Sequence, residues 1–273
     1  MNGFDLENPD HAYMFGFLQA DGHLSRDTRN RGRVTVELSA GDAPLLEAFQ
    51  RLCPCRSTLR YRTRATNFSP QHSAVVWSAY TLEFRRTLEE LGMPAGRKSA
   101  VVAPPRRPHA ERDYLRGLVD ADGSLGRAAQ DLPFVAFTTA SEALVGFFLA
   151  YTQRLTGGAG RTVNRNRRDG VFNAMFTNED AVALAGDLYY PGCLALPRKA
   201  HTSERVVSWI RPAGMRKVTR RSWTAAEDGL LLTAVSAAAA AADLGRTVRS
   251  CTMRRRRLLG RAEAGARRLR APA

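Results

Sequence analysis

The chain carries one short string twice at a fixed spacing. "GFLQADGHL" spans residues 16–24 and "GLVDADGSL" spans residues 117–125, so the two copies are offset by 101 residues. The same offset aligns "GRKS" at residues 96–99 with "PRKA" at residues 197–200. The repeat is therefore present at both ends of a unit of about 100 residues, the size of a small domain. Such a chain is expected to fold as two similar halves, followed by an appendix.

Each half is expected to begin with a helix that ends at a glycine. Asn8 fits the N-cap of the first helix, Pro9 its first turn and Gly22 its end, while the second helix runs from about His109 to Gly123. Small residues four positions apart share one face of each helix and allow two backbones to approach closely. These expected helix-interface residues are Gly16, Ala20, Gly117 and Ala121. We therefore expect the two helices to pack against each other.

Strands are expected after each helix. "RVTVELS" at 33–39 alternates apolar and polar residues, and "TLRYRTRA" at 58–65 places arginines on one face, with 74–82 as its partner strand. In the second half, residues 161–176 are typical of a hairpin that turns near Asp169 and Gly170. The arginines of these strands are Arg33, Arg60, Arg62, Arg64, Arg161, Arg165 and Arg167. Their faces either keep the protein soluble or form a groove for a nucleic acid.

An acidic residue and a lysine recur in the same register of the repeat. Packing of the two helices would bring Asp21 and Asp122 together at C-terminal helix ends, where the helix dipole is negative. Two carboxylates repel there unless a proton or a divalent cation neutralises them, and hard oxygen ligands suit Mg²⁺. The alternative is that each Asp only ends its helix. Lys98 and Lys199 each follow their aspartate by 77 residues, in a chain where 38 of 41 basic residues are arginine.

The positive charge is concentrated in the last part of the chain. The net charge is +15, and residues 211–273 hold 15 basic against 4 acidic residues, compared with 26 against 22 in residues 1–210. This balance favours a polyanionic partner. Thr224 with Glu227 predicts a capping box, and Thr247 a further N-cap, so a helix, a helix, a turn and a helix are expected. No apolar run approaches the ~20 residues of a membrane span, and no secretory signal is visible, so we expect a cytoplasmic protein without a membrane partner.

The two motifs resemble those of LAGLIDADG homing endonucleases of the single-chain, two-motif kind. The nine-residue signature matches "MFGFLQADG" at 14–22 and "LRGLVDADG" at 115–123, and the resemblance covers about residues 10–210. The first copy departs at its sixth position, where Gln19 replaces the usual acid. The functional acid of the family is the eighth position, and both copies keep it. The resemblance implies an α+β fold with two pseudo-symmetric αββαββα halves, 1–105 and 106–210, forming a saddle on a DNA duplex.

The resemblance also implies the chemistry. Asp21 and Asp122 would bind Mg²⁺ or Mn²⁺, and Lys98 and Lys199 would be the remaining catalytic residues of a monomeric, site-specific endonuclease that hydrolyses both strands of DNA. After a basic linker at 211–222, "SWTAAED" resembles the start of Myb-like helix-turn-helix modules. A module at 223–273 would then place its recognition helix at 248–259, with Arg249 and Arg254 as DNA contacts. A bundle that binds RNA, or one that is merely solvated, is the alternative for this part.

Two other functions fit the same resemblance. Some bacterial regulators, including sporulation regulators, resemble a LAGLIDADG core fused to a helix-turn-helix and bind DNA without cutting it. Their acidic motif positions are degenerate, whereas this chain keeps both aspartates and both lysines, which favours a nuclease. An intron-splicing maturase of the same fold is the third possibility. In each case, the expected setting is a bacterial or phage-encoded protein that associates with the nucleoid when bound to DNA.

Overall fold

The computed structural model describes residues 3–26, 32–65, 71–158, 163, 165–166, 168–215 and 223–269, with side chains up to residue 260. The chain divides into two compact units, Met1–Ala213 and Gly214–Ala273. The division falls inside the linker that the sequence predicts at 211–222. Two of the predicted strand arginines, Arg161 and Arg167, lie outside the described residues. Within the described part of the chain, no helix has the length and apolar character needed to cross a membrane.

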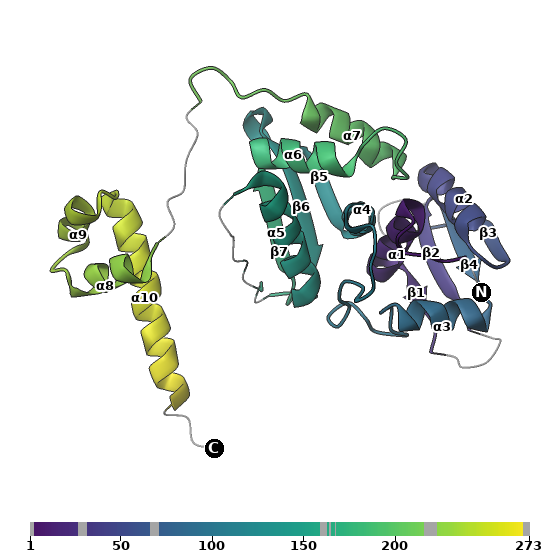
Figure 1. Cartoon of the computed structure of the whole chain (residues 1–273), viewed down its shortest axis with the longest axis horizontal. Coiled ribbons are helices and arrows are strands. Elements are labelled where there is room, and N and C mark those ends of the chain that lie inside the picture. The colour runs from purple at the N-terminus through teal and green to yellow at the C-terminus, as the bar shows by residue number, and fades with distance from the viewer. Residues whose placement is uncertain are drawn as a thin grey trace. The chain divides into compact units, whose positions relative to one another are not determined.

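The first half of the larger unit has the predicted αββαββα order (Figure 1). Its elements are α1 (Pro9–Asp21), β1 (His23–Leu24), β2 (Val34–Ser39), a 3₁₀ turn (Ala40–Asp42), α2 (Ala43–Leu52), β3 (Ser57–Arg64), β4 (His72–Ala79) and α3 (Leu82–Glu90). Helix α1 begins where the sequence predicts, because the Asn8 side chain accepts hydrogen bonds from the backbone N–H groups of Asp10 and His11. It ends at Gly22, whose N–H donates to the Leu18 carbonyl.

The second half repeats this order, with one strand only partly described. Its elements are α4 (Glu111–Asp122), β5 (Gly123–Arg127), a 3₁₀ turn (Ala129–Asp131), β6 (Pro133–Thr139), α5 (Glu142–Thr156), β7 (Phe172–Thr177), α6 (Glu179–Leu188) and α7 (Pro197–Val207). The turn of the predicted hairpin precedes β7, because Arg165 pairs with Phe172 in an antiparallel bridge and Gly170 turns the chain with φ of 71°. Helix α7 is additional to this order and carries Lys199.

Each half has an antiparallel sheet with helices on one face. The strand order is β1-β2-β4-β3 in the first half and β5-β6-β7 among the described strands of the second. Helix α2 packs its Phe49 ring edge-on against Trp77 of β4, at 6.2 Å between centroids. Helix α5 packs Phe148 against Phe137 and Phe176 with tilted rings, at 5.5 and 5.4 Å between centroids. The opposite face of the first sheet is free of these helices and carries the strand arginines. The α+β fold with two halves is therefore confirmed.

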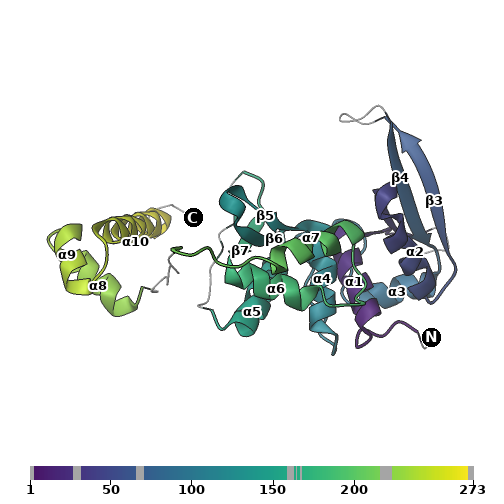
Figure 2. The ribbon, with the colours of Figure 1, turned by 90° about the horizontal axis from the view of Figure 1, so that it is seen from above.

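Helices α1 and α4 lie side by side between the two sheets (Figure 2). Gly16 of α1 lies against the backbone of Tyr114, where an added Cβ would be 2.2 Å from the carbonyl oxygen. Gly117 of α4 lies against Tyr13, where an added Cβ would be 2.1 Å from the carbonyl oxygen. No side chain fits in either gap, so two glycines set the distance between these helices. This contact places the ends of both motif helices in one region of the molecule.

The second unit is a small all-α structure. It consists of α8 (Ala225–Thr233), α9 (Ala237–Leu244) and α10 (Val248–Leu269), packed around a small core that includes Leu231 and Cys251. The predicted capping box is present, because the Thr224 and Glu227 side chains each accept a hydrogen bond from the other residue's backbone N–H. Gly245, with φ of 58°, ends α9, and the Thr247 hydroxyl accepts from the Ser250 N–H at the start of α10.

Candidate functional site

Asp21 and Asp122 are the last residues of α1 and α4, and both remain exposed to solvent. Desolvation by the surrounding protein raises the pKa of the Asp21 carboxyl, and it raises that of Asp122 to about 6. The charge of Asp21 is the second cause of the shift at Asp122, so the two carboxylates interact. The negative ends of two helix dipoles add to this repulsion. The site is therefore arranged to favour a bound cation.

Lys98 and Lys199 form hydrogen bonds with the C-terminal ends of the same two helices. The Lys98 ammonium donates to the carbonyl oxygens of Gln19 at 2.6 Å and Ala20 at 2.7 Å. The Lys199 ammonium donates to the carbonyls of Val119, Asp120 and Gly123, at 2.7, 2.7 and 2.8 Å. These carbonyls belong to the last turn or cap of a helix, where most backbone acceptors lack helical partners.

Burial lowers the pKa of both lysines to about 8, against the opposing effect of nearby carboxylates. Asp21 and Asp122 each raise the pKa of both Lys98 and Lys199. The four groups singled out from the repeat thus act on one another electrostatically, although they come from four separate segments of the chain.

A cavity opens beside each lysine. The cavity of the first half has a volume of about 440 Å³, and that of the second half about 190 Å³. The residues that line both at equivalent positions are Gly22 and Gly123, His23 and Ser124, Arg97 and Arg198, and Lys98 and Lys199. Each pair is separated by 101 residues, so the repeat forms two similar basic cavities next to the acidic pair. The two arginines were not among the residues predicted from the sequence, although each directly precedes its lysine.

The acidic pair fits a hard divalent cation. Among the described residues, no group of three or more His, Cys, Asp and Glu side chains is arranged to hold a metal ion. Two carboxylates are sufficient for Mg²⁺, which keeps several waters and commonly binds one or two protein carboxylates together with substrate phosphates. The mutual repulsion of Asp21 and Asp122, seen in the raised pKa of Asp122, is the property that a cation would relieve.

The sixth motif position links the two halves. Tyr114 of α4 donates its hydroxyl to Gln19 Oε1 at 2.5 Å, and Tyr13 of α1 donates to Asp120 Oδ2 at 2.6 Å. The two tyrosines are 101 residues apart, so the hydrogen bonds are related by the repeat. Sequence reasoning missed them, although both tyrosines stand in register one position before the motif.

The remaining contacts explain why Gln19 departs from the family pattern. Gln19 Nε2 donates to the carbonyls of Gly92 at 2.7 Å and Ala103 at 3.2 Å, which are acceptors only. Asp120 instead faces donors, the Tyr189 hydroxyl at 2.6 Å and the Leu196 N–H at 2.7 Å. An amide suits the first site and a carboxylate the second, because both positions are buried and need matched partners.

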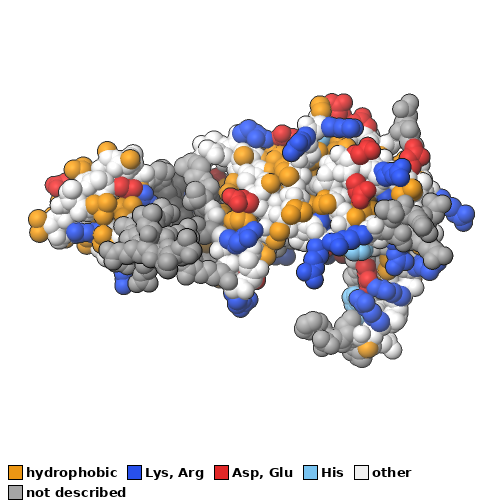
Figure 3. All heavy atoms as spheres, turned by 90° about the horizontal axis from the view of Figure 1, so that it is seen from below, with side chains coloured by type: hydrophobic (Ala, Val, Ile, Leu, Met, Phe, Trp, Pro, Cys, Tyr) orange, Lys and Arg blue, Asp and Glu red, His pale blue; other side chains and the backbone are white. Residues whose placement is uncertain are grey.

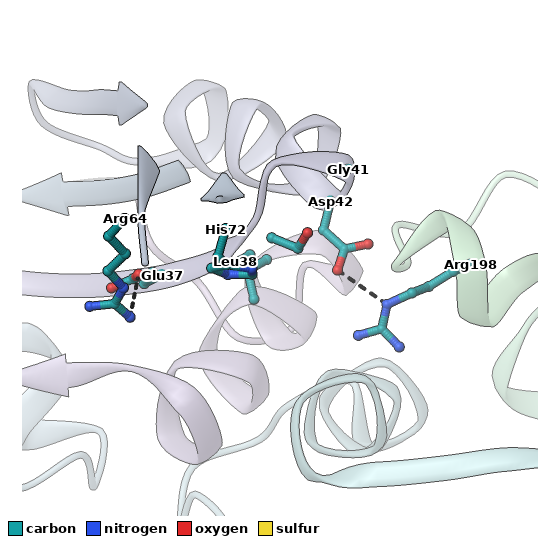
Figure 4. A pocket seen from close by; sticks show the side chains of 8 residues that line it. Glu37, Leu38, Gly41, Asp42, Arg64, His72 and Arg198 are labelled. Atoms are coloured by element: carbon teal, nitrogen blue, oxygen red, sulfur yellow. Dashed lines mark hydrogen bonds and ion pairs between the residues drawn. The ribbon is translucent and has the colours of Figure 1, made fainter. Parts of the chain in front are cut away.

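The arginines of the first sheet lie on the face that α2 leaves free. Arg33, Arg60, Arg62 and Arg64 are exposed, and Arg62 and Arg64 form ion pairs with Glu37 of β2. Figure 3 shows Lys and Arg side chains along the projecting β3–β4 hairpin and at the rim of the hollow beside it. A cavity of about 830 Å³ begins at this face and reaches α7, where Arg198 pairs with Asp42 at 3.1 Å (Figure 4).

Three of the predicted DNA-contacting arginines lie in distinct surroundings. Arg165 stacks on Phe172, at 5.1 Å from the ring centroid, and donates to the Ala140 carbonyl. Arg254 forms a two-point ion pair with Asp228, at 2.7 and 2.5 Å, so its guanidinium holds α10 to α8. Arg249 is exposed on α10. Of the two arginines predicted to contact DNA in the small unit, Arg249 is the one whose surroundings leave it accessible.

Comparison with known proteins connects this geometry to one family. Residues 109–185 match the sequence model of the LAGLIDADG-like domain. The homing endonuclease I-WcaI, in a structure bound to its DNA recognition sequence, is similar in fold with a TM-score of 0.50 and 10% identity, over 74% of this chain and 88% of that chain. I-SmaMI, bound to an uncleaved DNA target in the presence of calcium ions, gives a TM-score of 0.39 and 15% identity over 63% of this chain and 79% of that chain. No curated protein matches in sequence.

The family match runs from α4 into α6 of the second half and includes the second motif helix. The structural similarity to I-WcaI extends over most of the chain. Residues 109–185 are thus similar in sequence to the LAGLIDADG-like domain, and the fold is similar to that of the homing endonuclease I-WcaI.

Proposed function

We propose that the protein is a site-specific endonuclease that hydrolyses both strands of duplex DNA with a divalent cation, Mg²⁺ or Mn²⁺. The observation that carries the proposal is the paired arrangement at the ends of α1 and α4. Each aspartate ends its helix beside a cavity that contains an arginine and a lysine of the same half. Two such arrangements in one unit suit two scissile phosphates, one on each strand.

The proposed roles follow from the surroundings of each residue. Asp21 and Asp122 would hold the cation, which when bound polarises the phosphate and makes a water molecule more acidic. Arg97 and Arg198 line the cavities and would bind phosphate oxygens, for which the guanidinium fork is well suited. Their positive charge would stabilise the charge that develops on the phosphate during hydrolysis.

The lysines would act differently from a freely positioned general base. All three N–H donors of Lys199 are used by backbone carbonyls, so this ammonium holds the end of α4 in place. Lys98 does the same for α1 with two hydrogen bonds. Both keep positive charge next to the carboxylates, because a pKa of about 8 leaves each ammonium mostly protonated at neutral pH.

The remaining parts of the chain would provide binding. Halves 1–105 and 106–210 would each present a sheet face to the DNA, with arginines such as Arg60 on the first. A single chain supplies both halves, so we propose that it acts as a monomer. The unit at 223–273, after the basic linker 211–222, would be a helix-turn-helix module that binds DNA through α10. Tethering to the nuclease would raise the affinity for the whole site.

Incubation with a library of DNA duplexes tests the proposal. Duplexes that bind the purified protein are selected first, then incubated with Mg²⁺, Mn²⁺ or a chelator, and each strand is followed separately. We expect cuts in both strands at a defined position, with either metal and not with the chelator. Bound duplexes that are never nicked would contradict a nuclease. They would support a non-catalytic DNA-binding regulator, which the full use of the Lys199 donors by the backbone also favours.

A further inference from the structure

In each half, the side chain at the sixth motif position is hydrogen-bonded to the segment that carries the lysine. In the first half, Gln19 Nε2 bonds to the carbonyls of Gly92 and Ala103, and Lys98 lies between these two residues in the chain. Both ends of the segment 92–103 therefore lie against α1, where the buried amide of Gln19 holds them. The Lys98 ammonium reaches the end of α1 from this segment.

Asp120 performs the equivalent function in the second half. Its carboxylate accepts from the Tyr189 hydroxyl, just after α6, and from the Leu196 N–H, just before α7. The Leu196 carbonyl in turn accepts from the Lys199 N–H at 2.9 Å, in the first turn of α7. The start of the helix that carries Lys199 is therefore held against α4 by Asp120.

We propose that Gln19 and Asp120 are positioning residues, each of which sets the place of its own half's lysine and thereby controls cleavage of one DNA strand. This inference rests on the proposed nuclease function. Neither side chain lines the cavities beside Lys98 and Lys199, and both are buried. They act through the segments that they fasten.

Gln19 and Asp120 should respond differently to an exchange of amide and carboxylate, because their hydrogen-bond partners differ. In Gln19→Glu, one carboxylate oxygen would face two carbonyls that cannot donate, so the lysine segment would lose its attachment. In Asp120→Asn, the amide oxygen can still accept from Tyr13 and Leu196, while the amide N–H donates to the Tyr189 hydroxyl, which can rotate to accept. Asp120→Leu, of similar size, removes every acceptor. An exchange of amide and carboxylate should thus slow cleavage strongly at Gln19 and only slightly at Asp120.

The test is a cleavage assay in which the two strands of a bound duplex carry different labels. We expect Gln19→Glu to slow the cutting of one strand by about 100-fold, as small displacements of catalytic groups do, and to leave the other strand within about twofold. Asp120→Leu should slow the opposite strand, and Asp120→Asn should resemble the wild type. Gln153→Glu, on the exposed surface of α5, is the control for the chemical change alone. Equal slowing of both strands by Gln19→Glu, or no slowing, would overturn the inference.

A second measurement does not depend on cleavage. The chain has only three lysines, so the rate at which acetic anhydride modifies each one can be followed by mass spectrometry. Gln19→Glu should speed the modification of Lys98 and leave Lys199 unchanged, and Asp120→Leu should do the reverse. If the wild type cuts no DNA but these rates change as expected, the nuclease proposal fails and the positioning of the lysines stands. If both lysines change together in each variant, or neither does, the positioning inference is wrong.

Discussion

Replacement of Gly117 by alanine should disrupt the contact between α1 and α4. The new Cβ would lie 2.1 Å from the Tyr13 carbonyl oxygen and 2.8 Å from the Phe17 nitrogen, both backbone atoms of a buried helix. A carbon and a carbonyl oxygen do not normally approach closer than about 3.3 Å, so the helices would have to separate by about 1 Å. Backbone cannot rotate away as a side chain does. We therefore expect a loss of about 3 kcal/mol in the free energy of unfolding, the upper part of the range for overpacked cores.

Gly146→Ala is the matched control. Gly146 lies in the middle of α5, and an added Cβ there meets no atom within 4 Å. Because alanine favours a helix more than glycine does, this variant should gain about 0.5–1 kcal/mol. The two variants should differ by about 4 kcal/mol, a large part of the 5–15 kcal/mol that stabilises a typical domain. Urea unfolding followed by circular dichroism measures the difference. A midpoint for Gly117→Ala at or above that of Gly146→Ala would refute the close packing.

Four further predictions concern the carboxylates and the small unit. Asp122→Asn should abolish the cutting of at least one strand and leave DNA binding largely intact, as measured by strand-resolved cleavage and by gel shift. Without metal, the same variant should be more stable at pH 7: the raised pKa of Asp122 means that its stabilising contribution is present below about pH 4 and is lost as the pH rises through about 6. The gain in the free energy of unfolding should be about 1 kcal/mol. It is smaller than the energy that corresponds to the whole pKa shift of Asp122, because the carboxylate is exposed to solvent. Deletion after Ile210 should weaken DNA binding and flatten its salt dependence. Arg249→Ala should weaken binding without unfolding the small unit, whereas Arg254→Ala should lower its melting temperature.

Each of these predictions has an outcome that contradicts it. A loss of binding by Asp122→Asn with no specific loss of cutting would indicate a structural aspartate. A stability difference between this variant and the wild type that is the same at pH 4 and at pH 7 would mean that the carboxylate is not destabilised in the fold. An unchanged salt slope after truncation would remove the basic tail from the DNA interface. Equal effects of Arg249→Ala and Arg254→Ala on melting would contradict the structural role of the ion pair with Asp228.

The sequence was sufficient to predict features that depend on local chemistry. The start of α1 at Asn8, its end at Gly22 and the capping box at Thr224 follow from side chains that bond to backbone groups within one turn. The packing of two motif helices follows from the small residues at Gly16 and Gly117, since only a small face permits such an approach. The repeat also supplied the common register of the aspartates and lysines.

The contacts of the site could not be predicted, because they join distant segments. Gln19 meets carbonyls that are 73 and 84 residues away, and no local pattern shows whether those partners accept or donate. The departure from an acid at this position therefore looked like simple variation in the sequence. Likewise, Arg254 pairs with an aspartate 26 residues away, so its role in holding α10 to α8 was not visible in a run of arginines.

The way in which Lys199 binds the end of α4 also accounts for an unusual choice of residue. This chain uses arginine at 38 of its 41 basic positions, yet keeps lysine here. An ammonium group is compact and directs its three hydrogens toward three corners of a tetrahedron, which allows it to enter a converging ring of carbonyl oxygens. A guanidinium is flat and wide, and its five donors spread in one plane. At this site, the shape of the cation matters more than its charge, so arginine cannot take the place of lysine.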